Sequence, residues 1–231
     1  MQLFFQPQLP ESKFLDPDES KHCIKVLRKN IHDEINLIDG KGTFYKAKIT
    51  EAHHKKCKFE ILETTTEKKQ PFHRHLAIAP TKNMDRMEWL VEKATELGVD
   101  EISFFQSFHS ERKIVKIERI EKKVVSAIKQ SMKATMPKLN ELLPFNSILD
   151  NKGAINKFIA YVDFDNEVHL KDHLDAHKNT LILIGPEGDF TQEEVDLACK
   201  KGFVKVSLGK SRLRTETAAL AAVHLMNLVT D

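Results

Sequence analysis

Two glycine-containing segments hold the residues of this sequence that are best suited to bind a small molecule. The first, Gly185-Pro186-Glu187-Gly188, follows an apolar run, and glycines around a rigid proline let the backbone approach a ligand closely. An acid inside the loop, with no lysine after the second glycine, argues against a triphosphate ligand. The same pattern also occurs in plain turns between a strand and a helix, so this loop alone leaves both interpretations open.

The second segment repeats this arrangement one unit later. Gly209 and Lys210 follow the run VKVSL, and Arg212 and Arg214 stand just before Thr215, near the expected start of an alanine-rich helix. The positive end of the helix dipole disfavours cations there, so the two arginines favour an anionic partner. A solvated surface is the alternative for both side chains. Because the two segments follow successive predicted strands, they could face one site.

The elements that must position these loops alternate between strands and helices after residue 72. Short apolar runs predict buried strands, and helical periodicity separates them. Thr191 and Glu194 form a capping box that predicts a helix directly after the first loop. The pattern predicts an α/β fold, with a mainly parallel sheet covered by helices on both faces. The expected strands are 76–80, 101–105, 157–162, 180–184 and 204–208, and the last expected helix is 218–229.

The first seventy residues are rich in predicted strands instead. The runs 34–38, 43–49 and 57–62, with a turn at Asp39-Gly40, predict β-hairpins. A polar segment broken by Pro71 follows and is typical of a linker. We therefore expect two domains, residues 1–71 and residues 72–231.

Composition excludes several classes of protein. No apolar run approaches the ~20 residues that a membrane span needs, and the first residues lack the features of a secretory signal, so the expected location is the cytoplasm. Cys23, Cys57 and Cys199 are too scattered for disulfides or a zinc site, and His53-His54 with Cys57 lacks further ligands, so we expect no metal and an exposed loop there. Charge is uneven: residues 107–144 hold nine Lys or Arg against four acids, whereas residues 145–199 hold four against eleven. A basic zone is a candidate surface for phosphates.

Several segments together resemble one known family. The segments are HCIKVLRKN (22–30), KNMDRMEWLVEKATELGV (82–99), SERK (110–113), QSMKATMPKL (130–139), LIGPEGDFTQEEV (183–195) and LGKSRLRTETAALAA (208–222). They resemble the RsmE family, the small-subunit ribosomal RNA methyltransferases E of the SPOUT superfamily, and the likeness covers nearly the whole chain. It implies a PUA-like β-barrel RNA-binding domain (1–71) and a SPOUT methyltransferase domain (72–231) with a trefoil knot, assembled as a homodimer.

The resemblance also implies a reaction. S-adenosylmethionine would donate a methyl group to N3 of a specific uridine in 16S (small-subunit) ribosomal RNA, with the assembled subunit as the expected substrate. N3 carries a proton, so a proton acceptor such as Glu187 or Glu216 would help. A cation that stabilises the anion, such as Arg214 or Arg212, would help as well. Ser211 stands where the family has an arginine, which makes Arg214 the better candidate. The residues implied for the cofactor are Leu183, Gly185, Pro186, Glu187, Gly188, Leu208, Gly209, Leu213 and Thr217.

Contacts with RNA are expected from both domains. The candidates are His22, Lys25, Arg28, Lys29, Arg112, Lys113 and Lys133, and a solvated surface is the alternative for each. Trp89 lies on the apolar side of a helical segment and is predicted to be core. Phe104, Phe105 and Phe108 could line a pocket at the end of a strand.

Two other functions stay open at this point. One is methylation of a different RNA by an enzyme of the same superfamily. The other is a non-catalytic RNA-binding or ribosome-assembly factor in which the glycine loops are only turns. Binding of S-adenosylmethionine discriminates the second alternative from an enzyme.

Overall fold

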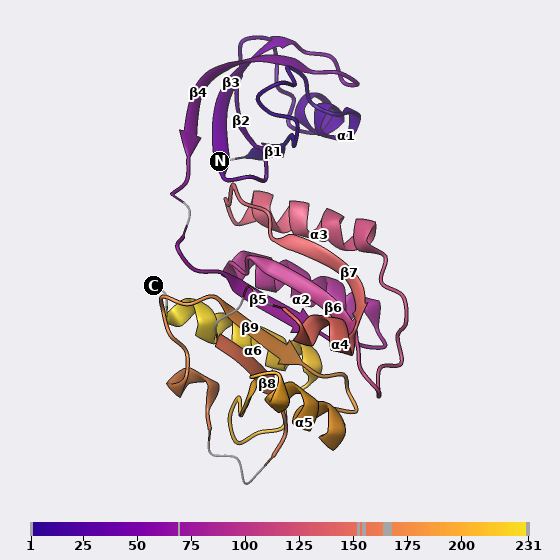
Figure 1. Ribbon diagram of the computed structural model, residues 1–231. Helices are drawn as coiled ribbons and strands as arrows, with labels where there is room; N and C mark the ends of the chain where they lie inside the picture. Colours follow the sequence, from indigo (N-terminus) through magenta and orange to yellow (C-terminus); the bar gives the residue numbers. More distant parts are fainter. Residues whose placement is uncertain (1, 69, 152, 154–155, 164–167, 230–231) are drawn as a thin grey trace. The chain divides into compact units, whose positions relative to one another are not determined.

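The chain divides into two compact units in its computed structural model (Figure 1), which describes residues 2–68, 70–151, 153, 156–163 and 168–229. Unit 1 comprises Met1–Lys69 and Val125–Met136, and unit 2 comprises Gln70–Val124 and Pro137–Asp231. The segment 125–136, which the sequence placed in the second domain, therefore groups with the first unit. Its backbone explains why: Met136 N–H donates to the Gly40 carbonyl at 2.8 Å, and Gly42 N–H donates to the Ala134 carbonyl at 3.1 Å.

Unit 1 is built on a four-stranded sheet in the order β1-β2-β3-β4. β2 pairs in parallel with β1 and antiparallel with β3, and β3 pairs antiparallel with β4, so the expected hairpins are present. Gly40 (φ 76°) and Gly42 (φ 103°) form the turn between β2 and β3 in the left-handed conformation that glycine tolerates. Cys57 is fully buried because it packs in the hydrophobic core of this unit with Cys23 and Leu15, so the exposed loop expected at 53–57 ends before this residue. The elements are β1 (Leu3–Phe5), α1 (Pro17–Lys21), a π-helical turn (His22–Val26), β2 (Glu34–Ile38), β3 (Thr43–Glu51) and β4 (Lys58–Thr66).

Unit 2 is an α/β structure, as the alternating pattern predicted. Its six strands are all parallel and lie in the order β10-β8-β9-β5-β6-β7. The elements are β5 (Arg74–Ile78), α2 (Met84–Leu97), β6 (Glu101–Gln106), α3 (Ile117–Gln130), β7 (Lys138–Pro144), α4 (Phe145–Leu149), β8 (Asn156–Ala160), a 3-10 turn (Leu170–Asp172), β9 (Thr180–Ile184), α5 (Gln192–Lys200), β10 (Val204–Val206) and α6 (Thr215–Leu228). The residues of α3 from Val125 onward belong to unit 1.

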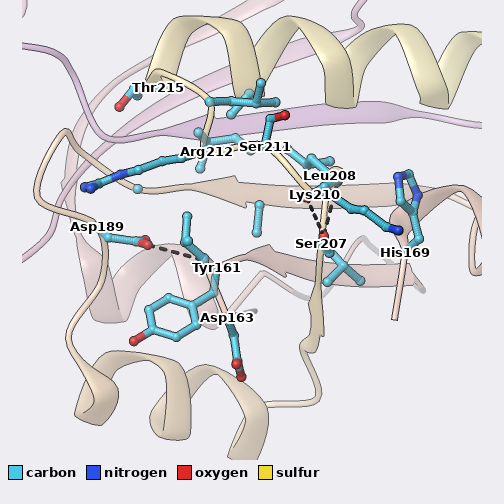
Figure 2. Close-up of a pocket in the computed structure, with 18 of the residues that line it drawn as sticks. Tyr161, Asp163, His169, Asp189, Ser207, Leu208, Lys210, Ser211, Arg212 and Thr215 are labelled. Atoms are coloured by element: carbon cyan, nitrogen blue, oxygen red, sulfur yellow. Dashed lines mark hydrogen bonds between the residues drawn. The ribbon is translucent and has the colours of Figure 1, made fainter. Parts of the chain in front are cut away.

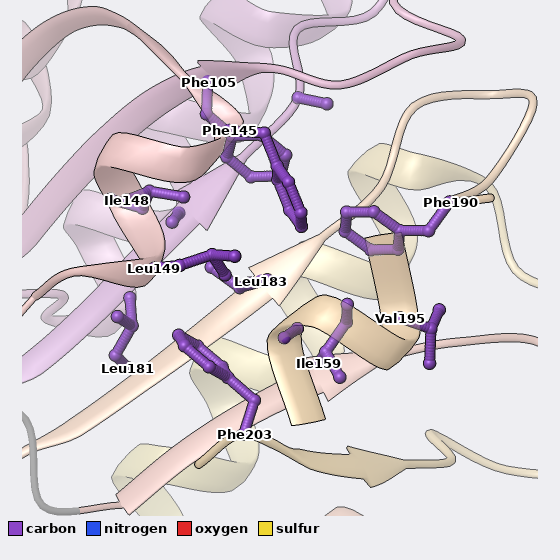
Figure 3. Packing of buried hydrophobic residues seen from close by; sticks show 13 residues of the cluster. Phe105, Phe145, Ile148, Leu149, Ile159, Leu181, Leu183, Phe190, Val195 and Phe203 are labelled. Carbon is purple, nitrogen blue, oxygen red and sulfur yellow. The ribbon is translucent and has the colours of Figure 1, made fainter. Parts of the chain in front are cut away.

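Helices cover both faces of this sheet. On one face, Phe145 of α4 and Val195 of α5 pack with Leu183 of β9 and with Phe105 and Phe190 (Figure 3). Successive side chains of a strand point to opposite faces, so the alternate residues of β5 and β9 point to the other face, where α6 packs on both strands and on α2. β7 was not predicted, because its sequence, KLNELLP, has no continuous apolar run. The short helix α4, with the sequence FNSIL, was not predicted either.

The aromatic residues of α2 and β6 differ from expectation. Trp89 is 47% exposed, so its assignment to the core is wrong; the helix buries Met87, Leu90 and Val91 instead. Phe104 and Phe105 are fully buried in the core and so line no open pocket among the residues that the structure describes, whereas Phe108, just after β6, is 79% exposed and lines an open hollow of about 740 Å³, as expected of it. Across the ranges that the structure describes, no helix combines the length and the apolar character that crossing a membrane would require.

Candidate functional site

A cavity of about 560 Å³ opens at the carboxyl ends of three neighbouring strands, β8, β9 and β10 (Figure 2). Because all strands are parallel, their carboxyl ends lie at one edge of the sheet, where α/β proteins bind ligands. The wall consists of 160–163 after β8, 184–186 and Asp189 after β9, 206–213 after β10, His169, and Thr215 and Ala218 of α6. The two glycine loops therefore face one site, as their positions in the sequence predicted.

The loop after β9 packs on the buried aromatic ring of Phe190. A Cβ atom on Gly185 would lie 3.1 Å from both Cδ2 and Cε2 of Phe190, so only glycine fits without a shift of this buried ring. Asp189 N–H donates to the Pro186 carbonyl at 3.0 Å and closes a tight turn. The loop is thus shaped by the core beneath it.

Asp189 joins this loop to the loop after β8. Its carboxylate accepts hydrogen bonds from Phe190 N–H (2.8 Å) and Val162 N–H (3.2 Å). Burial raises the pKa of Asp189 above its ordinary value, although both donors and the charge of Arg212 favour the ionised form. Asp189 lines the cavity but its hydrogen bonds are to backbone, so it fixes the positions of the two loops.

The loop after β10 is the more exposed wall. Ser207 Oγ accepts from Gly209 N–H at 3.1 Å, and Gly209 adopts a φ of 126° that favours glycine. The side chain of Arg212 extends toward Asp189, whereas Lys210 extends toward His169 (Figure 2). Cationic side chains thus stand on both sides of the cavity.

The cavity contains some of the residues predicted for a cofactor and excludes others. Leu183 is fully buried in the core, and Thr217 lies next to lining residues without lining the cavity itself. Gly188 faces another loop, since a Cβ there would lie 3.0 Å from Cβ of His109. The predicted residues that line the cavity are Gly185, Pro186, Leu208, Gly209 and Leu213, together with Arg212.

Glu187 and Arg214 lie outside this cavity. Arg214 is exposed and forms the N-cap of α6 without a side-chain capping bond. Glu187 lines a second hollow of about 450 Å³, and its Oε1 accepts from Lys82 N–H at 3.1 Å. Arg112 lines the same hollow and donates to the carbonyls of Thr81 (3.2 Å) and Lys82.

Sequence reasoning missed the wall that follows β8. Tyr161 lies at the end of the predicted strand 157–162 and Asp163 directly follows it, so the rule that ligands bind at carboxyl ends could have found them. Most of the others belong to the two glycine-containing segments or flank them, whereas no local signal marks His169. The lining residues that were not predicted include Tyr161, Asp163, His169, Asp189, Ser207, Lys210, Thr215 and Ala218.

The basic residues predicted to contact RNA are distributed over both units. In unit 1, Lys25 and Arg28 are exposed, whereas Lys29 is half-buried and donates to the Glu34 carbonyl at 3.3 Å. His22 and Lys133 of this unit are also half-buried. In unit 2, Lys113 is exposed, and Arg112 is held by backbone carbonyls.

Comparison with known proteins gives similarities over the full length of the chain. A family model described as an RNA methyltransferase domain matches residues 68–227, and one described as an RNA methyltransferase PUA domain matches residues 15–62. The ribosomal RNA small subunit methyltransferase E of Mesomycoplasma hyopneumoniae is 30% identical over 95% of this chain and 96% of that protein.

Solved structures agree with the sequence matches. The crystal structure of a probable rRNA-methyltransferase from Porphyromonas gingivalis is 40% identical with a TM-score of 0.94, covering 100% of this chain and 98% of that one. A ribosomal RNA small subunit methyltransferase E from Neisseria gonorrhoeae, bound to S-adenosyl methionine, is 32% identical with a TM-score of 0.84, covering 99% and 97%. The similarity therefore includes both units.

Proposed function

Because the chain belongs to the ribosomal RNA small subunit methyltransferase E family, we propose that it transfers a methyl group from S-adenosylmethionine to small-subunit ribosomal RNA. The observation that carries this proposal is the cavity at the ends of β8, β9 and β10. Its volume of about 560 Å³ suits a ligand of this size, and its walls are two glycine loops that approach from neighbouring strands. The relative from Neisseria gonorrhoeae, whose fold this chain shares, binds S-adenosyl methionine.

The residues that line the cavity are the proposed cofactor contacts. Gly185, Pro186, Leu208, Gly209 and Leu213 would hold the cofactor largely through backbone groups and apolar contact. Of the other candidates, Leu183 packs in the core next to the first loop. Gly188 lets the backbone of this loop approach His109 closely. Thr217 belongs to the first turn of α6, beside the lining residue Ala218.

The proposed acceptor atom is N3 of a specific uridine. The cofactor supplies the methyl group; the N3 lone pair forms the new bond, the carbon–sulfur pair stays on sulfur, and the N3 proton must leave. Arg214 or Arg212 stabilises the developing negative charge on the uracil carbonyl oxygens, and Glu187 accepts the proton. Of the two arginines, only Arg212 lines the cavity, whereas the exposed Arg214 is available to RNA.

Finer features of assembly and fold belong to the same proposal. We place a PUA-like barrel in the first unit and a trefoil knot in the second, and we expect a homodimer formed through the second unit, with the cytoplasm as the place of action. The proposed RNA contacts are His22, Lys25, Arg28, Lys29, Arg112, Lys113 and Lys133.

Two measurements test the function. Titration calorimetry should detect binding of S-adenosylmethionine and S-adenosylhomocysteine to the purified protein. Mass spectrometry of nucleosides from a deletion strain should show loss of 3-methyluridine from small-subunit RNA alone. Loss of a modification from transfer RNA or the large subunit would support a different methyltransferase, and RNA binding without cofactor binding would support an assembly factor; either result overturns the proposal.

A further inference from the structure

A second hollow adjoins the loop that walls the cofactor cavity. Gly185 and Pro186 line the cavity, whereas Glu187, the next residue, lines the hollow. The same division occurs at the start of α6, where Thr215 lines the cavity and Glu216 lies 3.8 Å from Arg86 of the hollow. The cavity and the hollow therefore meet at the loop 185–187, and the first residues of α6 lie beside both.

The loop before α2 and Arg112 build the rest of the hollow. Arg112 donates to the carbonyls of Thr81 and Lys82, and Lys82 N–H donates to Glu187, so segments from three strand ends are tied together. The hollow has a volume of about 450 Å³, large enough for a nucleotide, and it is open to solvent. Its lining residues are Lys82, Asn83, Met84, Asp85, Arg86, Arg112 and Glu187.

Three polar groups in this hollow have hydrogen-bonding capacity left for a ligand. Asn83 uses its Oδ1 to cap α2 by accepting from Asp85 N–H at 2.9 Å, which leaves its NH₂ group as a donor. Glu187 has one oxygen engaged by Lys82, which leaves Oε2 as an acceptor. Within the ranges that the structure describes, the guanidinium of Arg86 makes no hydrogen bond, and its ion pair with Glu216 at 3.8 Å is longer than one.

Two donors and one acceptor are the complement of the edge of a uracil ring. Uracil presents the O2 acceptor, the N3–H donor and the O4 acceptor in sequence. Cytosine differs at this edge, because its N3 is an acceptor and would face the carboxylate of Glu187 unfavourably. The geometry points to this hollow as the acceptor pocket, in which Glu187 accepts from N3–H while Arg86 and Asn83 each donate to one carbonyl oxygen. Each carbonyl oxygen keeps a second lone pair for the arginine, Arg214 or Arg212, that stabilises the developing charge.

The inference rests on the proposed function and assigns its substrate site. It places the proton acceptor on the acceptor side of the loop 185–188, next to the residues that would hold the methyl donor. The proton of N3 passes to Glu187 as N3 gains the methyl group. Glu216, whose Oε2 is buried with no hydrogen-bond partner in the described structure, acts as a positioning residue that keeps the charge of Arg86 in place.

The test compares kinetic constants with cofactor binding in the full-length protein. The substrate is the small ribosomal subunit from a strain lacking this enzyme. We expect Arg86→Ala to raise KM for the subunit at least about tenfold, and Glu187→Gln to lower kcat at least about tenfold, because each removes a charged hydrogen-bonding group from the ring edge. The Kd for S-adenosylmethionine should stay within about twofold of wild type, since neither side chain lines the cavity.

Matched controls separate this role from a structural one. Lys93→Ala removes an ion-paired cation further along α2, and Glu193→Gln neutralises an exposed acid in the first turn of α5; both should leave kinetics and melting unchanged. Arg86→Lys should give a KM for the subunit between those of wild type and Arg86→Ala, because it keeps the positive charge.

Wild-type kinetics in both Arg86→Ala and Glu187→Gln would overturn the acceptor pocket and leave the proposed function standing. A lowered Tm or a loss of S-adenosylmethionine binding in these variants would assign the two residues a structural role and would also overturn the acceptor pocket. A wild-type protein that neither binds S-adenosylmethionine nor methylates the subunit would instead overturn the proposed function.

Discussion

Gly185 offers the sharpest test of how the core shapes the cofactor loop. In Gly185→Ala, the added Cβ lies 3.1 Å from two ring atoms of Phe190 and 3.3 Å from Oδ1 of Asp189. Phe190 cannot move away freely, because it is buried and stacks on Phe105 with ring centroids 6.0 Å apart and planes at 7°. The loop must therefore shift instead, and it carries the cavity wall with it.

The expected magnitude follows from this crowding. Insertion of one carbon into a well-packed region costs about 1–3 kcal/mol, and Gly185 adds no strain from a positive φ. A loss of about 2 kcal/mol lowers the Tm of a chain of this size by about 4–8 °C. If half of that energy also opposes the bound loop conformation, the Kd for S-adenosylmethionine rises by roughly fivefold.

Differential scanning calorimetry with and without S-adenosylmethionine measures both effects. Gly153→Ala is the matched control, since among the residues that the structure describes a Cβ there meets only Asn151 Oδ1, at 3.5 Å. A Gly185→Ala protein with wild-type Tm and wild-type Kd would refute the claim that Phe190 dictates glycine at this position. Loss of stability with unchanged affinity would refute the link between the ring and the cavity.

Three further predictions concern charge, capping and pH. Arg214→Ala should lower the rate of methylation at least about 100-fold, because it removes a cation proposed to stabilise the developing charge. The Tm should not change, because this exposed side chain makes no capping bond; near-normal activity would remove Arg214 from the site. Thr191→Ala should lower the free energy of unfolding by about 1 kcal/mol, measured by urea denaturation, because it breaks the capping box with Glu194, and Thr191→Ser should restore most of it. Burial lowers the pKa of His75 from 6.5 to about 4, so the unfolded chain takes up the proton first as the pH falls, and about 3 kcal/mol of stability should be lost between pH 7 and pH 4. His75→Gln should flatten this part of the pH profile, and an unaltered profile would contradict the assignment. Glu101 does not interfere, because hydrogen bonds and nearby charges hold its pKa below the usual range despite its burial, so the stability that its carboxylate contributes is lost only at lower pH.

Much of the second unit was predictable because its signals are local. Apolar runs located the strands β5, β6, β8, β9 and β10, and the capping box located the start of α5. Once the strands are parallel, the two glycine loops must lie at the same edge of the sheet. The convergence of Gly185 and Gly209 on one cavity is therefore a consequence of the strand pattern.

The remaining features depend on contacts between distant segments. β7 was missed because polar residues interrupt its leucines, so that no continuous apolar run or strict alternation marks a strand. Trp89 was misplaced because periodicity alone does not say how far a helix face is covered. The second hollow joins residues 82–86 with Arg112 and Glu187, which no spacing in the sequence connects. The grouping of 125–136 with the first unit likewise rests on backbone bonds to Gly40 and Gly42.

The central place of β5 in the sheet has a consequence for the protein during its synthesis. β5 pairs with β6, made about twenty-five residues later, and with β9, made about a hundred residues later. Until β9 emerges from the ribosome, one edge of the apolar strand Arg74–Ile78 has no partner and is open to pairing with other chains. The cavity also needs Ala218, so a nascent chain cannot be stabilised by cofactor until nearly all of it has been made. Slow translation between β6 and β9 should therefore favour aggregation, and free S-adenosylmethionine cannot prevent it.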